Sequence, residues 1–212
     1  KFKVPINLTV IQASIFKFCK NLEKVVINEN SKINYFGSEA FYESGIQKIY
    51  IPSNIKIIDK SCFENCIDLT VLNFATNIND CIIKEKAFSM IGITELSIPK
   101  GIKQIHYGCF EGCPNLKKVN FSVDLTMNEI EENVFKSTSI ESITIPSSIK
   151  IVGKSSFQNC KNLTNVQFLG SNIAIKKIEE RLNEIEMNIK SILKKNELDS
   201  VLTEELMTII EL

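Results

Sequence analysis

Paired cysteines are the residues of this sequence with the clearest capacity for chemistry. Residues 61–66 read SCFENC and residues 108–113 read GCFEGC, so two thiols lie four positions apart in each segment. Such pairs can bind zinc, form a redox disulfide, or pack as small apolar side chains. A zinc site usually needs four converging Cys or His ligands with C-x2-C spacing, and this chain has one histidine. We therefore expect no bound metal and no cofactor.

The spacing of the cysteines along the chain favours buried free thiols. One series recurs every 47 residues, at Cys19, Cys66, Cys113 and Cys160. If this repeat stacks as parallel strands, equivalent cysteines lie two strand spacings apart, about 9–10 Å. A disulfide requires Cα atoms no more than about 6.8 Å apart. The thiols are therefore expected to fill space, which suits a reducing compartment but is also compatible with burial outside the cell.

The remaining residues offer no catalytic set. His106 is the only candidate base for activating a nucleophile. If the repeats stack into a curved array, its segment 103–108 is expected on the convex side. Acidic pairs such as Glu131 and Glu132 occur in polar stretches, where solvated charge is the usual state. No Gly-rich phosphate-binding loop is present. We predict a protein without enzymatic activity.

The overall composition narrows the classes of partner. The 212 residues carry 25 basic and 25 acidic side chains, so the net charge does not favour nucleic acid or an anionic membrane as a partner. No stretch approaches 18 uninterrupted apolar residues, so we predict no membrane span.

A repeat of 47 residues organises the chain. Prolines at 5, 52, 99 and 146 keep this step, as do phenylalanines at 16, 63, 110 and 157. A second phenylalanine series, at 41, 88 and 135, divides each unit into modules of 25 and 22 residues. Seven segments have apolar residues at relative positions 1, 4 and 6, the L-x-x-L-x-L signature of leucine-rich repeats: LEKVVI (22–27), IQKIYI (46–51), LTVLNF (69–74), ITELSI (93–98), LKKVNF (116–121), IESITI (140–145) and LTNVQF (163–168).

The rest of each module resembles one family of such repeats. After the strand come a Pro turn, a second apolar run, and a Phe three residues before Cys, as in residues 51–66, 98–113 and 145–160. This order resembles the BspA-type leucine-rich repeat family and covers residues 4–169. The resemblance implies a solenoid that is mostly β, with parallel strands on one side and short strands or turns on the other.

This fold sets the expected domains and core. We assign residues 1–170 to an array of about seven modules and residues 171–212 to a C-terminal helical segment. We expect Phe63, Phe110 and Phe157 inside the array, between the two sides. The segment KFKVP (1–5) enters at the end of a strand, so we expect either that the array continues upstream or that the missing part of its module is disordered.

Arrays of this kind usually bind through the outward residues of the strand sheet. The alternation along the strands predicts a mixed polar surface that is either an ordinary solvated face or a protein- or glycan-binding surface. The candidate partner-binding residues are Glu23, Lys24, Gln47, Lys48, Tyr50, Thr94, Glu95, Lys117, Lys118, Asn120, Glu141 and Thr144.

The C-terminal segment changes to a helical period. Apolar residues follow one another at steps of 3 and 4, as in a coiled-coil seam: Ile175, Ile178, Leu182, Ile185, Ile189 and Ile192. The helices predicted for residues 171–212 either fold back as a cap over the last module or form a coiled coil with the same or another chain.

These features together predict a protein-interaction scaffold. Proteins that the sequence resembles include surface adhesins of mucosal bacteria and families of parasitic protozoa, some exposed on the surface and others intracellular. Our first hypothesis is an intracellular assembly component, cytoplasmic or associated with the cytoskeleton, that binds other proteins through the sheet and the tail. The alternative is a cell-surface adhesin or matrix-binding protein.

Overall fold

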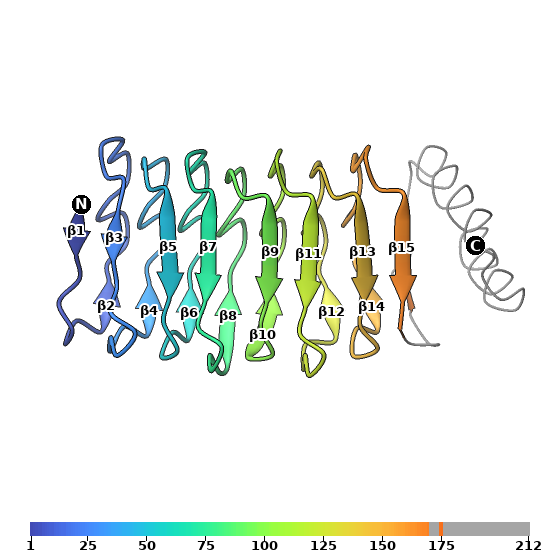
Figure 1. Cartoon of the computed structure of the whole chain (residues 1–212), viewed down its shortest axis with the longest axis horizontal. Helices are drawn as coiled ribbons and strands as arrows, with labels where there is room; N and C mark the ends of the chain where they lie inside the picture. Colours follow the sequence, from blue (N-terminus) through green and yellow to red (C-terminus); the bar gives the residue numbers. More distant parts are fainter. Residues whose placement is uncertain (170–173, 176–212) are drawn as a thin grey trace, which may run out of the picture.

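The chain winds through coils that stack along one axis, as the computed structural model shows for residues 1–169, 174 and 175 (Figure 1). Each module forms one coil, and each coil contributes one short strand to a front sheet and one to a rear sheet. All strand pairs are parallel. This arrangement confirms the predicted solenoid, because a single module could not bury its own apolar residues.

The front sheet contains the strands of the leucine-rich signature. The paired strands are in register, a bridge between Lys24 and Lys48 joins the second strand to the third, and no pairing joins the fourth strand to the fifth. Its strands are β1 (Phe2–Lys3), β3 (Val25–Val26), β5 (Lys48–Ile51), β7 (Val71–Phe74), β9 (Glu95–Ile98), β11 (Lys118–Phe121), β13 (Ser142–Ile145) and β15 (Asn165–Phe168).

The rear sheet contains the second apolar run of each module, as the sequence predicts. Its strands are β2 (Val10–Ile11), β4 (Tyr35–Phe36), β6 (Ile57–Ile58), β8 (Cys81–Ile83), β10 (Ile102–Ile105), β12 (Glu129–Ile130), β14 (Ile151–Val152) and β16 (Ala174–Ile175). The last strand corrects one prediction. Ile175 pairs with Val152 in β16 instead of starting a helix, because the backbone of β14 offers it a parallel partner. The other residues of the helical stripe lie outside the described residues.

A turn around the repeated phenylalanine connects each rear strand to the next front strand. We call these segments the Phe turns: residues 14–18, 39–43, 61–65, 86–90, 108–112, 133–137 and 155–159. In each one the backbone is left-handed two residues before and two residues after the phenylalanine; around Phe63, for example, Ser61 has φ 54° and Asn65 has φ 60°. Only the turn around Phe110 uses glycine at both positions, Gly108 and Gly112. The other turns hold residues with a side chain in a conformation that such residues seldom adopt.

The Phe turns form a third hydrogen-bonded side of the solenoid. The amide of Phe63 donates to the carbonyl of Ala87 in the next coil at 2.7 Å, and the amide of Asn65 donates to that of Ser89 at 3.0 Å. Equivalent bonds link successive turns from residue 14 to residue 158. Backbone bonds between successive Phe turns therefore join all the described coils, which explains how the strained turns are maintained. Strand pairing adds to these bonds except between β7 and β9 and between β10 and β12.

The core is a single cluster that runs the length of the described array. The phenylalanines of both series stack in one column, with ring centroids of neighbours 4.8–5.9 Å apart between Phe41 and Phe157. Offset stacking at this separation is a favoured aromatic geometry. Phe63 and Phe110 are fully buried as predicted, whereas Phe157 at the end of the column is only partly buried.

Candidate functional site

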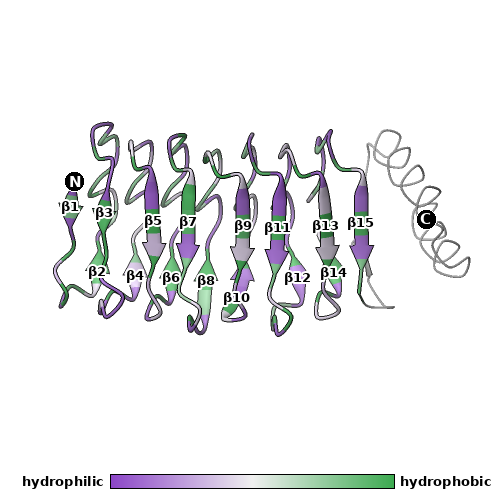
Figure 2. Ribbon diagram, viewed as in Figure 1, coloured by the Kyte–Doolittle hydropathy of each residue, from purple (hydrophilic) through white to green (hydrophobic). Residues whose placement is uncertain are grey.

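The outward side chains of the front sheet form three parallel rows. We call this surface the sheet face, and the register of the strands aligns equivalent residues of successive coils on it. Lys118, for example, lies opposite Glu95 on one side and Ser142 on the other. Hydrophilic and hydrophobic residues alternate along the front strands (Figure 2), and none of the large exposed apolar side chains within the described residues belongs to a front strand.

The structure brings the predicted partner-binding residues together on this sheet face. Ten of the twelve are exposed, and Tyr50 and Asn120 are partly buried. The first row runs through Glu23, Gln47, Thr94, Lys117 and Glu141 just before the strands. The second contains Lys24, Lys48, Glu95 and Lys118, and the third contains Tyr50, Asn120 and Thr144.

Charges in the C-terminal half of the sheet face are paired. Lys117 lies 3.1 Å from Glu141, and Lys118 lies 3.6 Å from Glu95. The amide of Asn120 donates to the same Glu95 carboxylate at 2.6 Å. All four charged side chains are more than half exposed, so each pair contributes at most about 1 kcal/mol to stability. The charged side chains of these pairs can therefore form ion pairs with another protein instead.

The cysteines are free thiols that pack in the interior, as predicted. Cys19 is partly exposed and the other six are buried. The thiol of Cys66 donates to the carbonyl of Phe41 in the preceding coil at 2.9 Å, and Cys113 and Cys160 make the equivalent bond. Burial raises the pKa of Cys66 to about 11 and that of Cys113 to about 12, so neither forms a reactive thiolate at neutral pH. Among the described residues, no cluster of three or more His, Cys, Asp or Glu could hold a metal ion.

His106 lies beside a carboxylate that could orient a catalytic imidazole, but no nucleophile of the described residues lies beside it. Its Nδ1 lies 2.8 Å from a carboxylate oxygen of Glu131. Its Nε2 is buried and has no hydrogen-bond partner, so no Ser or Cys of the described chain stands within hydrogen-bond reach of that nitrogen. Base-activated nucleophilic chemistry needs that contact. The contact with Glu131 instead links the end of β10 to the coil of β12.

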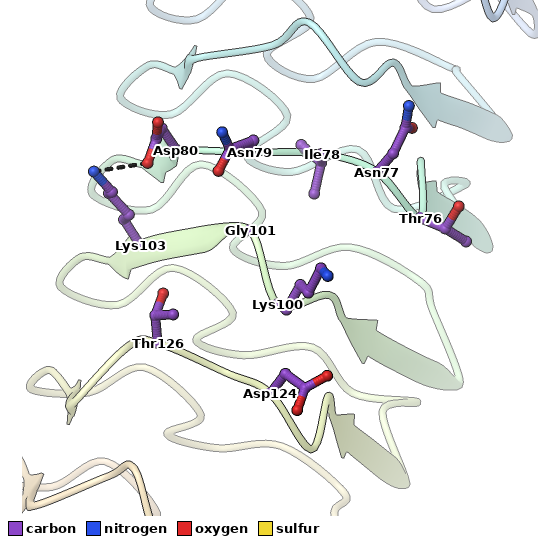
Figure 3. A pocket seen from close by; sticks show the side chains of 10 residues that line it. All are labelled: Thr76, Asn77, Ile78, Asn79, Asp80, Lys100, Gly101, Lys103, Asp124 and Thr126. Carbon is purple, nitrogen blue, oxygen red and sulfur yellow. Dashed lines mark ion pairs between the residues drawn. The ribbon is translucent and has the colours of Figure 1, made fainter.

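A polar hollow of about 670 Å³ opens on the fourth side of the solenoid, between the connecting loops (Figure 3). These loops join front strands to rear strands, and they alternate between short Pro turns and longer loops. The hollow lies where the short turn at 99–101 is flanked by the longer loops 75–80 and 122–128.

Both signs of charge line this hollow. Lys103 pairs with Asp80 at 2.7 Å, and Lys100 and Asp124 stand on neighbouring loops (Figure 3). Asn and Thr side chains supply the remaining polar groups. Because two lysines balance two aspartates, the hollow selects neither anions nor cations by net charge. It offers hydrogen-bond donors and acceptors without a chemical preference.

The sequence analysis missed both the hollow and the left-handed positions. The hollow depends on Gly101, where an added Cβ would lie 1.9 Å from the carbonyl oxygen of Ile78. In the equivalent Pro turn, Asn54 fills the space and donates to the carbonyl of Ser31 at 2.7 Å. The change from Asn to Gly between otherwise matching turns was the signal available in the sequence.

Family comparison assigns most of the chain to one repeat model. The model described as "BspA type Leucine rich repeat region" matches six copies over residues 1–82 and 81–204. No curated protein sequence matches the chain. Within the described part of the structure, no helix has the length and apolarity needed to cross a membrane.

Three solved structures share the fold. A leucine-rich repeat protein from Bacteroides ovatus aligns with a TM-score of 0.55 at 19% identity, over 82% of this chain and 58% of that chain. A leucine-rich cell surface protein from Faecalibacterium prausnitzii aligns with a TM-score of 0.51 at 20% identity, over 82% and 49%. The pneumococcal vaccine antigen PcpA aligns with a TM-score of 0.54 at 20% identity, over 83% and 40%. The chain thus spans roughly half the length of these proteins.

Proposed function

Because the chain belongs to the BspA-type leucine-rich repeat family, we propose that it is a non-enzymatic scaffold that binds another protein through the sheet face. The observation that carries this proposal is the set of aligned polar rows on a rigid array. Backbone bonds along the Phe turns and within the sheets fix the spacing of these side chains, so a partner meets a preorganised surface and little conformational entropy is lost on binding.

The charge pairs of the sheet face suit a protein partner. Exposed pairs such as Lys117 with Glu141 contribute little to folding. They can instead complement acidic and basic side chains across an interface, where charge complementarity sets specificity and association rate. The polar, mixed character of the face fits the rim of a reversible interface better than an obligate one.

A charge-reversal experiment tests this proposal. Lys117→Glu with Lys118→Glu should lower the capture of a partner from an extract of the source cells while leaving Tm almost unchanged. Lys100→Glu with Lys161→Glu is the matched control, because both lysines are exposed, lie away from the sheet face and have no ion pair with another described residue. Equal capture by the two double variants, or an equal loss of folding, would contradict sheet-face binding.

Our first hypothesis for the setting is an intracellular assembly component that also uses residues 171–212, as a cap or in a coiled coil. Seven free cysteines support it, because a reducing compartment keeps thiols free. If the tail recruits partners, removing residues 176–212 should change the set of captured proteins. The same partners captured with and without the tail would contradict this role.

The alternative is a cell-surface adhesin. It is supported by the likeness to a protein described as a leucine-rich cell surface protein. Antibody staining of intact and permeabilised cells separates the two settings. Staining of intact cells would favour the adhesin, and staining only after permeabilisation would favour the assembly component.

A further inference from the structure

The sheet face divides into two halves by the way its lysines are partnered. In the C-terminal half, Lys118 lies opposite Glu95 on the neighbouring strand. In the N-terminal half, Lys24 and Lys48 occupy the same row and lie directly opposite each other. Both are exposed, and no acidic side chain of the described residues lies within ion-pair distance of either. We call these two residues the lysine pair.

The lysine pair is an unfavourable arrangement for the isolated fold. Like charges directly opposite each other on neighbouring strands destabilise a sheet, whereas opposite charges stabilise it. Lys3 on β1 adds a third exposed cation to the same region, while Glu23, just before Lys24, is exposed and has no ion pair with another described residue. Tyr50 lies next to this group in the third row and is partly buried. The region therefore presents an excess of positive charge beside an aromatic ring.

The sequence of this chain contains a segment of matching chemistry. Residues 196–212 read NELDSVLTEELMTIIEL, with five acidic residues, no basic residue, and apolar residues between them. Over residues 171–212 as a whole there are nine acidic and six basic side chains, a net charge of −3. This acidic, partly apolar segment complements a basic surface that carries a tyrosine.

The lysine pair and the acidic segment stand near opposite ends of the sequence, so copies that associate end to end would bring them together. The pair lies on β3 and β5, near the start of the array, and β15 lies at the opposite end (Figure 1). Six strand spacings of about 4.8 Å separate β3 from β15, or about 29 Å. We propose that the lysine pair binds the acidic segment 196–212 of a second copy of this chain. The contact is heterologous, because it joins different surfaces of the two copies and can continue from copy to copy.

This inference rests on the proposed function, since it assigns one partner to one half of the sheet face. The test measures the association of purified full-length chain by sedimentation velocity over a range of protein concentrations at low salt. Lys24→Glu with Lys48→Glu should raise the dissociation constant about tenfold, because it replaces two attractive contacts with repulsive ones. The variant should fold normally, since two glutamates oppose each other as the two lysines did.

Matched variants make the result specific. Lys100→Glu with Lys161→Glu has the same change of charge at exposed lysines away from the sheet face and should leave self-association unaltered. Neutralising the segment, by Glu197→Gln, Asp199→Asn, Glu204→Gln and Glu205→Gln, should weaken association as much as reversing the lysine pair. Mixing the variant with a reversed lysine pair and a chain carrying Glu204→Lys with Glu205→Lys should restore association between the two.

Several outcomes would overturn the proposal. These are a chain that stays monomeric at every concentration, and association that survives reversal of the lysine pair but is lost when residues 176–212 are removed. The second result would identify a coiled coil instead. Equal weakening by the Lys100 and Lys161 variant would show non-specific attraction only. None of these outcomes affects the capture of other proteins, so failure here is distinguishable from failure of the proposed function.

Discussion

The Phe turns and the connecting loops stand at opposite edges of the solenoid and follow opposite rules. Every described Phe turn has the same length, two left-handed residues, and backbone bonds to a neighbouring turn. The connecting loops alternate in length, and one group of them encloses the polar hollow. The Phe turns therefore fix the spacing of the coils, while the connecting loops can change without disturbing that spacing.

The difference lies in what each edge packs against. The Phe turns cover the aromatic column, so a change in their length would move a buried ring. The connecting loops face solvent on their outer side and carry polar side chains such as Asn77 and Asp124. Loops with such exposure tolerate variation and commonly carry function. Substitutions at the two edges should therefore have unequal effects.

The largest effect is expected in the aromatic column. Phe88→Ala removes a fully buried ring that stacks on Phe63 at 5.1 Å and on Phe110 at 5.5 Å, and should cost about 3–5 kcal/mol of unfolding free energy. Phe157→Ala should cost less, because that ring is partly exposed and has one stacking neighbour. Urea denaturation measures both. Equal losses would mean that the column does not act as the core.

A smaller effect is expected at the hollow. Gly101→Ala places a methyl group against the backbone of Ile78, where neither atom can move without shifting a loop, and should cost about 1–3 kcal/mol. Asn54→Ala at the equivalent turn removes one hydrogen bond to Ser31 and should cost about 1 kcal/mol. Thermal melts of the two variants compare the turns directly. An unchanged Tm for Gly101→Ala would show that the connecting loops shift more readily than their close packing indicates.

The next effect has the opposite sign. Ser137 is exposed and has φ 57°, so Ser137→Gly should relieve backbone strain at a position where glycine is the preferred residue. We expect a gain of up to about 1 kcal/mol, because the greater entropy of glycine in the unfolded chain offsets part of the relief. Denaturant midpoints measure it. Destabilisation by Ser137→Gly would indicate a side-chain role that the structure does not reveal.

The rear sheet allows a test that depends on pH alone. Tyr35 donates a short hydrogen bond to Asp59 in the next coil, and this bond raises the pKa of Tyr35 to about 12. Since the phenol ionises near pH 10 in the unfolded chain, its contribution is complete below pH 10 and disappears as pH rises to about 12. Stability should fall more between these values in the parent chain than in Tyr35→Phe. Parallel pH profiles for the two would contradict the role of this bond.

The sequence predicts those parts of the molecule that repeat. Seven aligned segments with fixed apolar positions reveal the front strands, and the phenylalanine series indicates the core, because stacked coils must place equivalent residues at equivalent points. The outward residues of the sheet face follow from simple alternation. The free thiols follow from the distance between equivalent coils.

What does not repeat is harder to predict. Glu39, Lys86 and Met90 have left-handed backbones, but their residue types carry no such signal, because glycine and asparagine are the usual markers. Ile175 belongs to both a helical stripe and the rear-strand pattern, and pairing with β14 decided between them. The hollow lies among three loops that are separated in the sequence, so the glycine at position 101 is only a local sign of it.

The backbone bonding along the Phe turns has a consequence for how such a protein can change its length. Unequal recombination between similar coding segments can insert or delete 47 residues. Such an event adds or removes one pair of coils and leaves the same kind of contact between the coils on either side. The rod then grows or shortens by about 10 Å per event, two strand spacings. The length of the array can thus change in fixed increments. We expect selection to act on the distance between its two ends.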